Sequence, residues 1–244
     1  MDESHHKSAE WMRSQIQREL HTPLEFRAAL LSVPPAERDA WLDSVLELRD
    51  LPDDGPDLPR GCVPYFPCSV DALLRMVDQA DVRASDVFVD VGSGVGRTAA
   101  FVHLLTGAGV IAIEIQSGLV LAARELATRM LVSRVSCIEG DAAGLTGFIT
   151  IGSVFFLYCP FSGERLAKVL GHLEAIARTK TIRVCCVDLP LPPCPWLSLE
   201  RQLSGDLTIY RSTRGGAPST GTGSCTQSPP QVASPQTEVA GASG

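Results

Sequence analysis

Short apolar runs alternate with longer segments of helical periodicity through the middle of the chain. Each run is nearly continuous in valine, isoleucine, leucine or phenylalanine, which is the pattern of strands buried on both faces. The expected strands are 87–91, 110–115, 135–138, 154–158, 182–187 and, last, 207–210. The expected helices between them are 98–105, 119–130 and 165–177. This alternation predicts an α/β domain over residues 61–212, a Rossmann-like sheet with helices on both faces.

Residues 1–60 show a different pattern, in which apolar residues recur at helical spacing. Three such segments cover residues 11–20, 24–31 and 34–48. The sequence LPDDGPDLPRG (51–61) follows, and its prolines, aspartates and glycines mark a linker or turn. We therefore expect a helical N-terminal appendage with a linker in front of the α/β domain.

The C-terminal segment, residues 213–244, has the composition of a disordered tail. Glycine, serine, threonine and proline make up 20 of its 32 residues, and only Arg214 and Glu238 are charged. Such a segment cannot bury enough apolar surface to offset the entropy lost on ordering.

The charge of the chain is concentrated in the N-terminal appendage. The chain has 21 Lys+Arg against 28 Asp+Glu, a net charge of -7, and residues 1–60 hold 13 of the acids and 7 of the bases. This balance argues against a strongly basic nucleic-acid binder, and no DNA-binding patch is evident. The acidic appendage could attract a basic peptide, or it could be a lid whose acids are simply solvated. We favour the second interpretation.

Several other classes of protein are disfavoured by composition. No segment approaches the ~18 consecutive apolar residues of a membrane span, and the polar, charged N-terminus does not resemble a secretory signal. We expect a cytoplasmic monomer. The eight cysteines form no CxxC pair and the five histidines are scattered, so we expect reduced structural thiols and no metal site. The cysteines expected within apolar strand runs are Cys137, Cys159, Cys185 and Cys186.

A glycine loop follows the strand at 87–91 and leads into a helix. Its glycines, Gly92, Gly94 and Gly96, allow a sharp turn and the close approach of a ligand. The helix that follows offers unpaired N–H groups to an anion. The spacing is GxGxG, whereas the dinucleotide fingerprint GxGxxG would need glycine at Arg97. We expect Arg97 to be solvated rather than to contact a cofactor carboxylate.

Three acidic residues beside the loop indicate which ligand it holds. Asp90 stands two residues before Gly92, where a carboxylate can pair with a cationic amino group but would repel a pyrophosphate. Glu114 ends the second strand, where it can accept hydrogen bonds from ribose hydroxyls. Asp141 follows the third strand and can accept from the exocyclic amino group of adenine. A ligand with an amino-acid head, a ribose and an adenine is S-adenosylmethionine (SAM).

At this point the sequence resembles the class I SAM-dependent methyltransferases, over roughly residues 61–212. The motifs that carry the resemblance are VDVGSGVG (89–96), IAIEI (111–115), EGDA (139–142) and FFLYCPF (155–161). The resemblance implies a class I methyltransferase sheet, SAM as cofactor, and methyl transfer to a protein or small-molecule acceptor.

The same resemblance implies a role for each matching residue. Asp90 and the three loop glycines would hold the methionyl part of SAM. Glu114 would hold the ribose, and Asp141 with Ala142 would lie by the adenine.

A narrower resemblance comes from the segment in front of the glycine loop. PYFPCS (64–69), a helix at 70–77 and then VFVDVGSGVGR follow one another as in the non-SET lysine methyltransferases. That branch comprises the disruptor of telomeric silencing and its bacterial relatives. The resemblance implies that Tyr65 and Cys68 line the SAM or acceptor pocket and that a protein lysine is an acceptor. Cys68 stands where that branch usually has threonine.

The fourth strand ends in Tyr158-Cys159-Pro160-Phe161, where amino-methylating relatives often carry a polar-Pro-Pro-aromatic motif. Tyr158 replaces the usual asparagine or aspartate, which disfavours methylation of DNA bases. Tyr158 could orient an acceptor through its hydroxyl or could simply pack. Pro160 and Phe161 are kept, and Phe161 could border the sulfonium because aromatic faces attract cations.

Two other functions stay open from the sequence. A NAD(P)-dependent Rossmann oxidoreductase shares the fold and Glu114, although Arg97 and Asp90 count against it. A non-catalytic partner subunit with a SAM-type fold is compatible with the altered YCPF motif. At Asp188, which ends the fifth strand, a role as a catalytic carboxylate and a role in a turn are equally compatible with the sequence.

Overall fold

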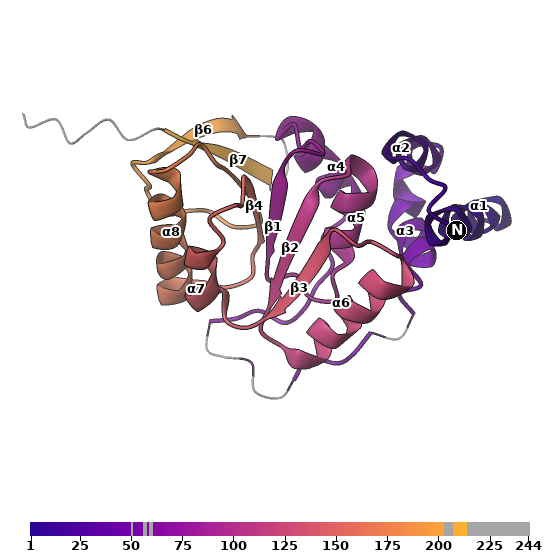
Figure 1. Ribbon diagram of the computed structural model, residues 1–244, viewed down its shortest axis with the longest axis horizontal. Helices are drawn as coiled ribbons and strands as arrows, with labels where there is room; N and C mark the ends of the chain where they lie inside the picture. Colours follow the sequence, from indigo (N-terminus) through magenta and orange to yellow (C-terminus); the bar gives the residue numbers. More distant parts are fainter. Residues whose placement is uncertain (50, 56–57, 59–60, 203–206, 214–244) are drawn as a thin grey trace, which may run out of the picture.

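A mixed sheet runs through the centre of the protein in the order β3-β2-β1-β4-β5-β7-β6 (Figure 1). The computed structural model describes residues 1–49, 51–55, 58, 61–202 and 207–213. β1 to β5 are parallel, whereas β7 runs antiparallel to both β5 and β6. The strands are β1 (Val87–Val91), β2 (Gly109–Glu114), β3 (Val135–Glu139), β4 (Val154–Tyr158), β5 (Arg183–Val187), β6 (Leu197–Gln202) and β7 (Leu207–Ser212).

Helices cover both faces of the sheet, as the continuous apolar runs predict. Side chains alternate along β1, so that Phe88 points to one buried cluster and Val89 to the other. α4 (Val70–Gln79), α5 (Arg97–Thr106) and α6 (Ser117–Arg129) cover the Phe88 face. α7 (Ala142–Leu145), η2 (Thr146–Phe148) and α8 (Gly163–Ala177) lie on the Val89 side (Figure 1). The predicted α/β fold with helices on both faces is confirmed.

The strand β6 was not predicted, and Cys159 was placed wrongly. β6 reads LSLERQ, and polar residues interrupt it because it lies at the edge of the sheet beside a single partner. A search for continuous apolar runs therefore does not detect this strand. Cys159 follows the end of β4 with a φ of 39°, in the turn that leaves the sheet.

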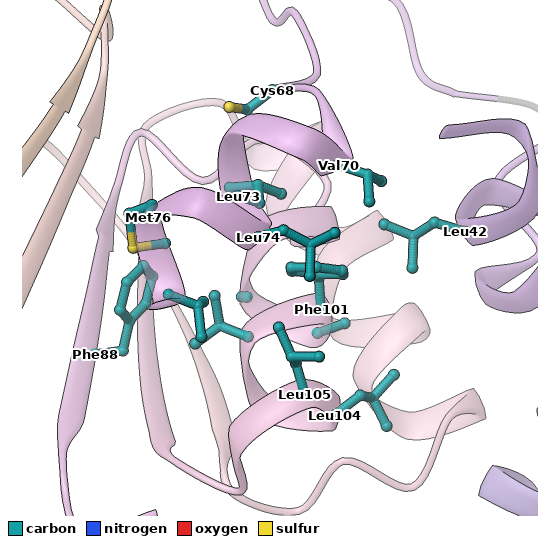
Figure 2. Close-up of a cluster of buried hydrophobic side chains, with 14 of the residues drawn as sticks. Leu42, Cys68, Val70, Leu73, Leu74, Met76, Phe88, Phe101, Leu104 and Leu105 are labelled. Carbon is teal, nitrogen blue, oxygen red and sulfur yellow. The ribbon is translucent and has the colours of Figure 1, made fainter. Parts of the chain in front are cut away.

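The N-terminal residues form helices that share a hydrophobic core with the sheet domain. They are α1 (Glu3–Gln17), α2 (Pro23–Leu31), η1 (Pro35–Glu37) and α3 (Arg38–Leu46). The ring of Phe26 in α2 lies 5.8 Å from that of Trp41 in α3 and 6.2 Å from that of Phe101 in α5. Figure 2 shows Leu42 facing α4 across the same cluster. Each large side chain buried here contributes about 1.5–3 kcal/mol relative to exposure.

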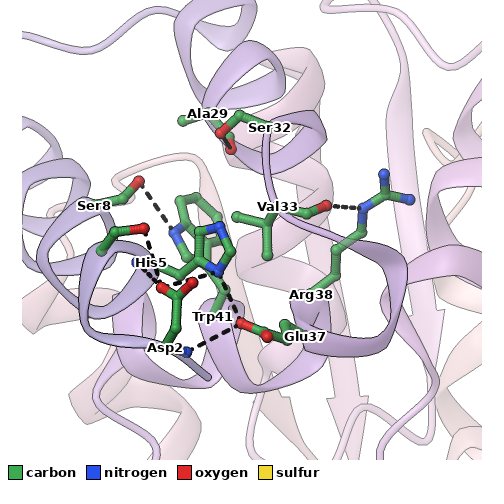
Figure 3. A network of polar contacts seen from close by, with 10 residues as sticks. Asp2, His5, Ser8, Ala29, Ser32, Val33, Glu37, Arg38 and Trp41 are labelled. Carbon is green, nitrogen blue, oxygen red and sulfur yellow. Dashed lines mark hydrogen bonds and ion pairs between the residues drawn. The ribbon is translucent and has the colours of Figure 1, made fainter.

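Hydrogen bonds fix the start of the N-terminal helices (Figure 3). The carboxylate of Asp2 caps α1 by accepting from the backbone N–H of His5, and the ring of His5 contacts Glu37 at 2.8 Å. Within the described ranges, Asp2, His5 and Glu37 are the one set of three or more residues whose metal-ligating atoms lie close together. Capping and the His5–Glu37 contact already account for this arrangement.

The cysteines and the helices bear on two further expectations from the sequence. Each cysteine that the structure describes is a free thiol, and Cys68, Cys185 and Cys186 are buried.

Among the described residues, no helix is both long and apolar enough to cross a membrane. The predicted tail lies outside the described residues apart from Thr213, and so does part of the linker.

Candidate functional site

The glycine loop lies between β1 and α5 and is packed closely from two sides. Gly92, Gly94 and Gly96 all have positive φ, at 82°, 55° and 76°. A Cβ on Gly92 would lie 2.6 Å from Cβ of Pro160, and one on Gly94 would lie 2.1 Å from the ring of Tyr65. Glycine is therefore required here both for conformation and for space. The loop brings together the PYFPCS and YCPF segments, which are nearly 100 positions apart in the sequence.

Three buried polar atoms around this loop have no hydrogen-bond partner in the part of the chain that the structure describes. They are Oδ2 of Asp90, Oγ of Ser93 and the hydroxyl oxygen of Tyr65. Asp90 is only 3% exposed, and its burial raises its pKa to about 7, with the negative charge of Glu114 adding to the shift. A buried carboxylate oxygen without a partner is costly. These three groups are therefore suited to form hydrogen bonds or an ion pair with the polar groups of a ligand.

The buried Asp90 predicts an unusual pH dependence of stability. The folded chain keeps the Asp90 proton up to about pH 7, whereas the unfolded chain releases it near the ordinary aspartate pKa of 3.8. The folded state therefore loses stability as the pH rises from about 4 to about 7. We expect urea unfolding to show a loss of about 2–3 kcal/mol between pH 5 and pH 7 that Asp90→Asn lacks. Identical pH profiles for the two proteins would contradict the assignment.

Glu114, at the end of β2, is tied to the glycine loop. Its Oε2 accepts from the backbone N–H of Gly94 at 2.9 Å, and its Oε1 accepts from those of Ile115 and Gln116 at 2.7 and 2.9 Å. The side chain is 8% exposed and borders a cavity. Since a carboxylate offers about four lone-pair sites, Glu114 has capacity left for a ligand hydroxyl.

Asp141 occupies the corresponding place after β3, but in this structure it also has local partners. Its Oδ1 accepts from the backbone N–H of Ala143 at 2.9 Å and so caps the short helix α7. Its Oδ2 forms an ion pair with Arg165 at 2.6 Å. The side chain is half-exposed and borders the same cavity as Glu114.

Residues 61–67, which we call the strap, cross over the carboxyl ends of the strands. Cys62 pairs with Phe161 in an antiparallel bridge, and the N–H of Val63 donates to the carbonyl of Pro160 at 3.3 Å. On the other side of the cavity, the N–H of Tyr65 donates to Asp54 at 3.0 Å.

Gln116 joins this side of the strap to the end of β2. Its Nε2 donates to the same carboxylate of Asp54 at 2.7 Å, and its Oε1 accepts from the N–H of Gly55 at 2.7 Å. Gln116 was not among the residues predicted from the sequence, although its place two residues after Glu114 was a usable signal.

The strap forms one wall of an open cavity of about 340 Å³ at the carboxyl ends of β1 to β4. The predicted site residues that line it are Tyr65, Gly92, Glu114, Asp141, Ala142, Tyr158, Pro160 and Phe161. Asp90, Gly94 and Gly96 belong to β1 and the adjoining loop. Cys68 borders a second cavity. The structure thus brings the candidate residues to one edge of the sheet, while their roles toward a cofactor stay predictions.

Arg97 is buried, so the prediction from the sequence that it is solvated was wrong. It is 3% exposed and donates to Asp43 at 2.6 Å, to Asp39 at 2.9 Å and to the carbonyl of Cys68 at 2.7 Å. Burial alone would lower the pKa of Arg97, but Asp43 and Asp39 outweigh it and hold that pKa above its ordinary value. The prediction failed because both acids come from α3, whose position against α5 depends on the tertiary fold.

Comparison with known proteins identifies the fold. No family model matches the chain, and no curated protein matches it. Among solved structures, the putative methyltransferase yhhF from Escherichia coli is 19% identical with a TM-score of 0.51, covering 68% of this chain and 93% of its own. The protein therefore has the class I SAM-dependent methyltransferase fold.

Two further solved structures match at lower TM-scores. An RNA methyltransferase from Salinibacter ruber, in complex with S-adenosyl-L-homocysteine, is 28% identical, covering 60% of this chain and 92% of its own, with a TM-score of 0.48. A precorrin-6y C5,15-methyltransferase from Geobacter metallireducens is 12% identical, covering 63% of this chain and 93% of its own, with a TM-score of 0.45.

Proposed function

We propose that the protein is a SAM-dependent methyltransferase that acts on a protein or small-molecule acceptor. The observation that carries this proposal is the buried Asp90 carboxylate, whose Oδ2 lacks a partner among the described residues beside the glycine loop. A cationic amino group placed there would offset the cost of burying the carboxylate, whereas a phosphate would add to it. SAM carries such an amino group.

The residues around the cavity fit the remaining parts of SAM. Ser93 and the Tyr65 hydroxyl are further unpartnered groups, within the described chain, for the amino-acid end. Glu114 has capacity for the ribose, and Asp141 with Ala142 borders the place for the adenine. A volume of about 340 Å³ lies within the usual range of small-molecule pockets.

In this reaction the protein would position the acceptor and SAM, and it would not need to form a covalent intermediate. SAM supplies a methyl group already activated by its sulfonium. Tyr158, Pro160 and Phe161 border the cavity at the end of β4, where they would orient the acceptor and exclude water. Such positioning can contribute about 7–11 kcal/mol in well-oriented cases. The resemblance to the non-SET lysine methyltransferases adds a protein lysine to the acceptors that we propose.

The two alternative functions make different demands on the same site. A NAD(P)-dependent oxidoreductase would bring a pyrophosphate to the glycine loop, beside the buried Asp90. A non-catalytic subunit would bind SAM without transferring the methyl group, or would not bind it at all.

A thermal-shift panel of SAM, S-adenosylhomocysteine, NAD and ATP tests the proposal. We expect SAM and S-adenosylhomocysteine to raise the melting temperature, because a ligand at 100 times its Kd stabilises the folded state by about 2.7 kcal/mol. Stabilisation by NAD, with none by either SAM-type ligand, would refute the proposal. Incubation of a lysate with SAM labelled in its methyl group would then separate an enzyme from a non-catalytic subunit.

A further inference from the structure

One side of α8 points away from the sheet and is open to solvent. Figure 1 shows α8 at the outer margin of the fold, beside α7. The apolar residues of α8 pack into the buried cluster on the Val89 side of the sheet. We call the opposite side of the helix, together with the C-cap residue Arg178, the α8 face. It carries Glu164, Ala167, Lys168, Gly171, Glu174, Ala175 and Arg178, which are exposed apart from the half-exposed Glu174.

The centre of the α8 face is a glycine that the rest of the chain does not explain. Gly171 lies in the middle of a 15-residue helix, where glycine is unfavourable relative to alanine. A Cβ added to Gly171 would meet no heavy atom of the described residues within 4 Å, and Gly171 is not among the glycines with positive φ. Ala167 and Ala175 lie one turn to either side of it on the same face. Small residues in this arrangement let the backbone of a second helix approach closely.

The charged residues of the α8 face are complementary to one another about Gly171. Lys168 and Glu174 lie three positions before and after it, and Glu164 and Arg178 lie seven positions before and after it. If two copies of α8 cross antiparallel at Gly171, Lys168 of each copy lies beside Glu174 of the other. Glu164 of each copy likewise lies beside Arg178 of the other. A parallel crossing would instead bring like charges together, so the charge pattern favours the antiparallel arrangement.

We propose that two copies of this chain form a symmetric dimer in which the α8 faces pack antiparallel and cross at Gly171. A two-fold axis satisfies every charge pair twice, as in other self-complementary interfaces. The α8 face lines neither cavity, so the proposal does not depend on the proposed function. It departs from the monomer expected from the sequence. Two crossed helices bury less than the about 1,200–2,000 Å² of a standard interface, so we expect a reversible dimer with a Kd on the order of 100 µM.

Sedimentation velocity of the full chain tests the proposal, at concentrations from about 10-fold below to about 5-fold above the expected Kd. A reductant is included because the described cysteines are free thiols. We expect the sedimentation coefficient of the wild type to rise with concentration toward that of a dimer.

Gly171→Gln separates loss of the interface from damage to the fold. We expect it to weaken the dimer at least about tenfold, because its side chain fills the space where the two helices cross. Its melting temperature should not fall, because glutamine favours a helix more than glycine does and the position is open. Ala28→Gln is the matched control, since it enlarges an exposed small residue of α2 instead, and it should dimerise like the wild type.

Two charge variants test the pairing across the interface. Glu164→Lys with Glu174→Lys makes the α8 face basic. Lys168→Glu with Arg178→Glu makes it acidic. Each variant alone should associate at least about tenfold more weakly than the wild type, because like charges then face each other. An equimolar mixture of the two should form a heterodimer, and adding Gly171→Gln to the acidic variant should abolish that heterodimer.

Three results would overturn the proposal. The first is a wild type that stays monomeric over the whole concentration range. The second is a dimer that Gly171→Gln leaves unchanged or that Ala28→Gln disrupts instead. The third is a mixture of the two charge variants that still associates when Gly171→Gln is present, because general charge attraction would then explain the association.

Discussion

Replacement of Arg97 by methionine is expected to lower the free energy of unfolding by about 2–3 kcal/mol. The substitution keeps much of the side-chain volume but removes the donors to Asp39, Asp43 and the carbonyl of Cys68. Breaking a fully buried ion pair typically costs about 3–5 kcal/mol. We expect less here because the Asp39 and Asp43 side chains are 50% and 39% exposed, and water can solvate them once the arginine is gone.

Urea unfolding of Arg97→Met checks this expectation, with Arg178→Met as the matched control. Arg178 forms an ion pair with Glu174 on the surface of α8, and its side chain is 71% exposed. Its loss should change the free energy of unfolding by less than about 0.5 kcal/mol. We also expect Arg97→Lys to fall short of full stability, because an ammonium cannot replace the fork of the guanidinium. If Arg97→Met has the same free energy of unfolding as the wild type, the buried network contributes nothing to stability.

Replacement of Glu114 by alanine is expected to weaken the binding of SAM and S-adenosylhomocysteine by about 10- to 100-fold. The change removes the proposed acceptor of the ribose hydroxyls, and a hydrogen bond to a charged group is worth about 1.5–3 kcal/mol. It also leaves the N–H groups of Gly94, Ile115 and Gln116 without their carboxylate. Glu114→Gln keeps an oxygen acceptor of similar shape, so it should retain more of the fold's stability while still losing affinity.

Calorimetric titration with S-adenosylhomocysteine measures this loss, and Glu139→Gln provides the control. Glu139 ends β3 in direct register with Glu114 of β2, but its carboxylate bonds to Ser117 at the surface instead of lining the cavity. We expect Glu139→Gln to bind like the wild type. Unchanged affinity in a folded Glu114→Ala protein would remove Glu114 from the proposed cofactor site.

The sheet and the edge that carries the candidate site could be predicted because both depend on local pattern. A strand buried on two faces is largely apolar, so β1, β2, β4 and β5 are evident as runs of mostly apolar residues. Asp90 within β1, Glu114 at the end of β2 and Asp141 after β3 are brought together because parallel strands end at the same edge of the sheet. β6 could not be predicted in this way because an edge strand with polar residues has no such pattern.

Long-range partners could not be predicted from local pattern either. Arg97 follows a glycine loop, and nothing local shows that α3 places two carboxylates beside it. The hydrogen bonds between Gln116 and Asp54 likewise join residues more than 60 positions apart. Asp141 illustrates the opposite case, since its capping of α7 is a local role that coexists with a place at the cavity.

The buried Arg97 network also has an evolutionary consequence. Asp39 and Asp43 lie one helical turn apart, and Arg97 lies more than 50 positions further along the chain. The buried guanidinium is tolerated because the two aspartates balance its charge, whereas the partly exposed aspartates can be solvated without it. Descendants of this chain that lose both acids should therefore also replace Arg97 with an uncharged residue, while descendants that lose Arg97 alone can keep the acids. Arg97 is thus the dependent member of the three positions, and its inheritance couples the glycine loop to the N-terminal helices.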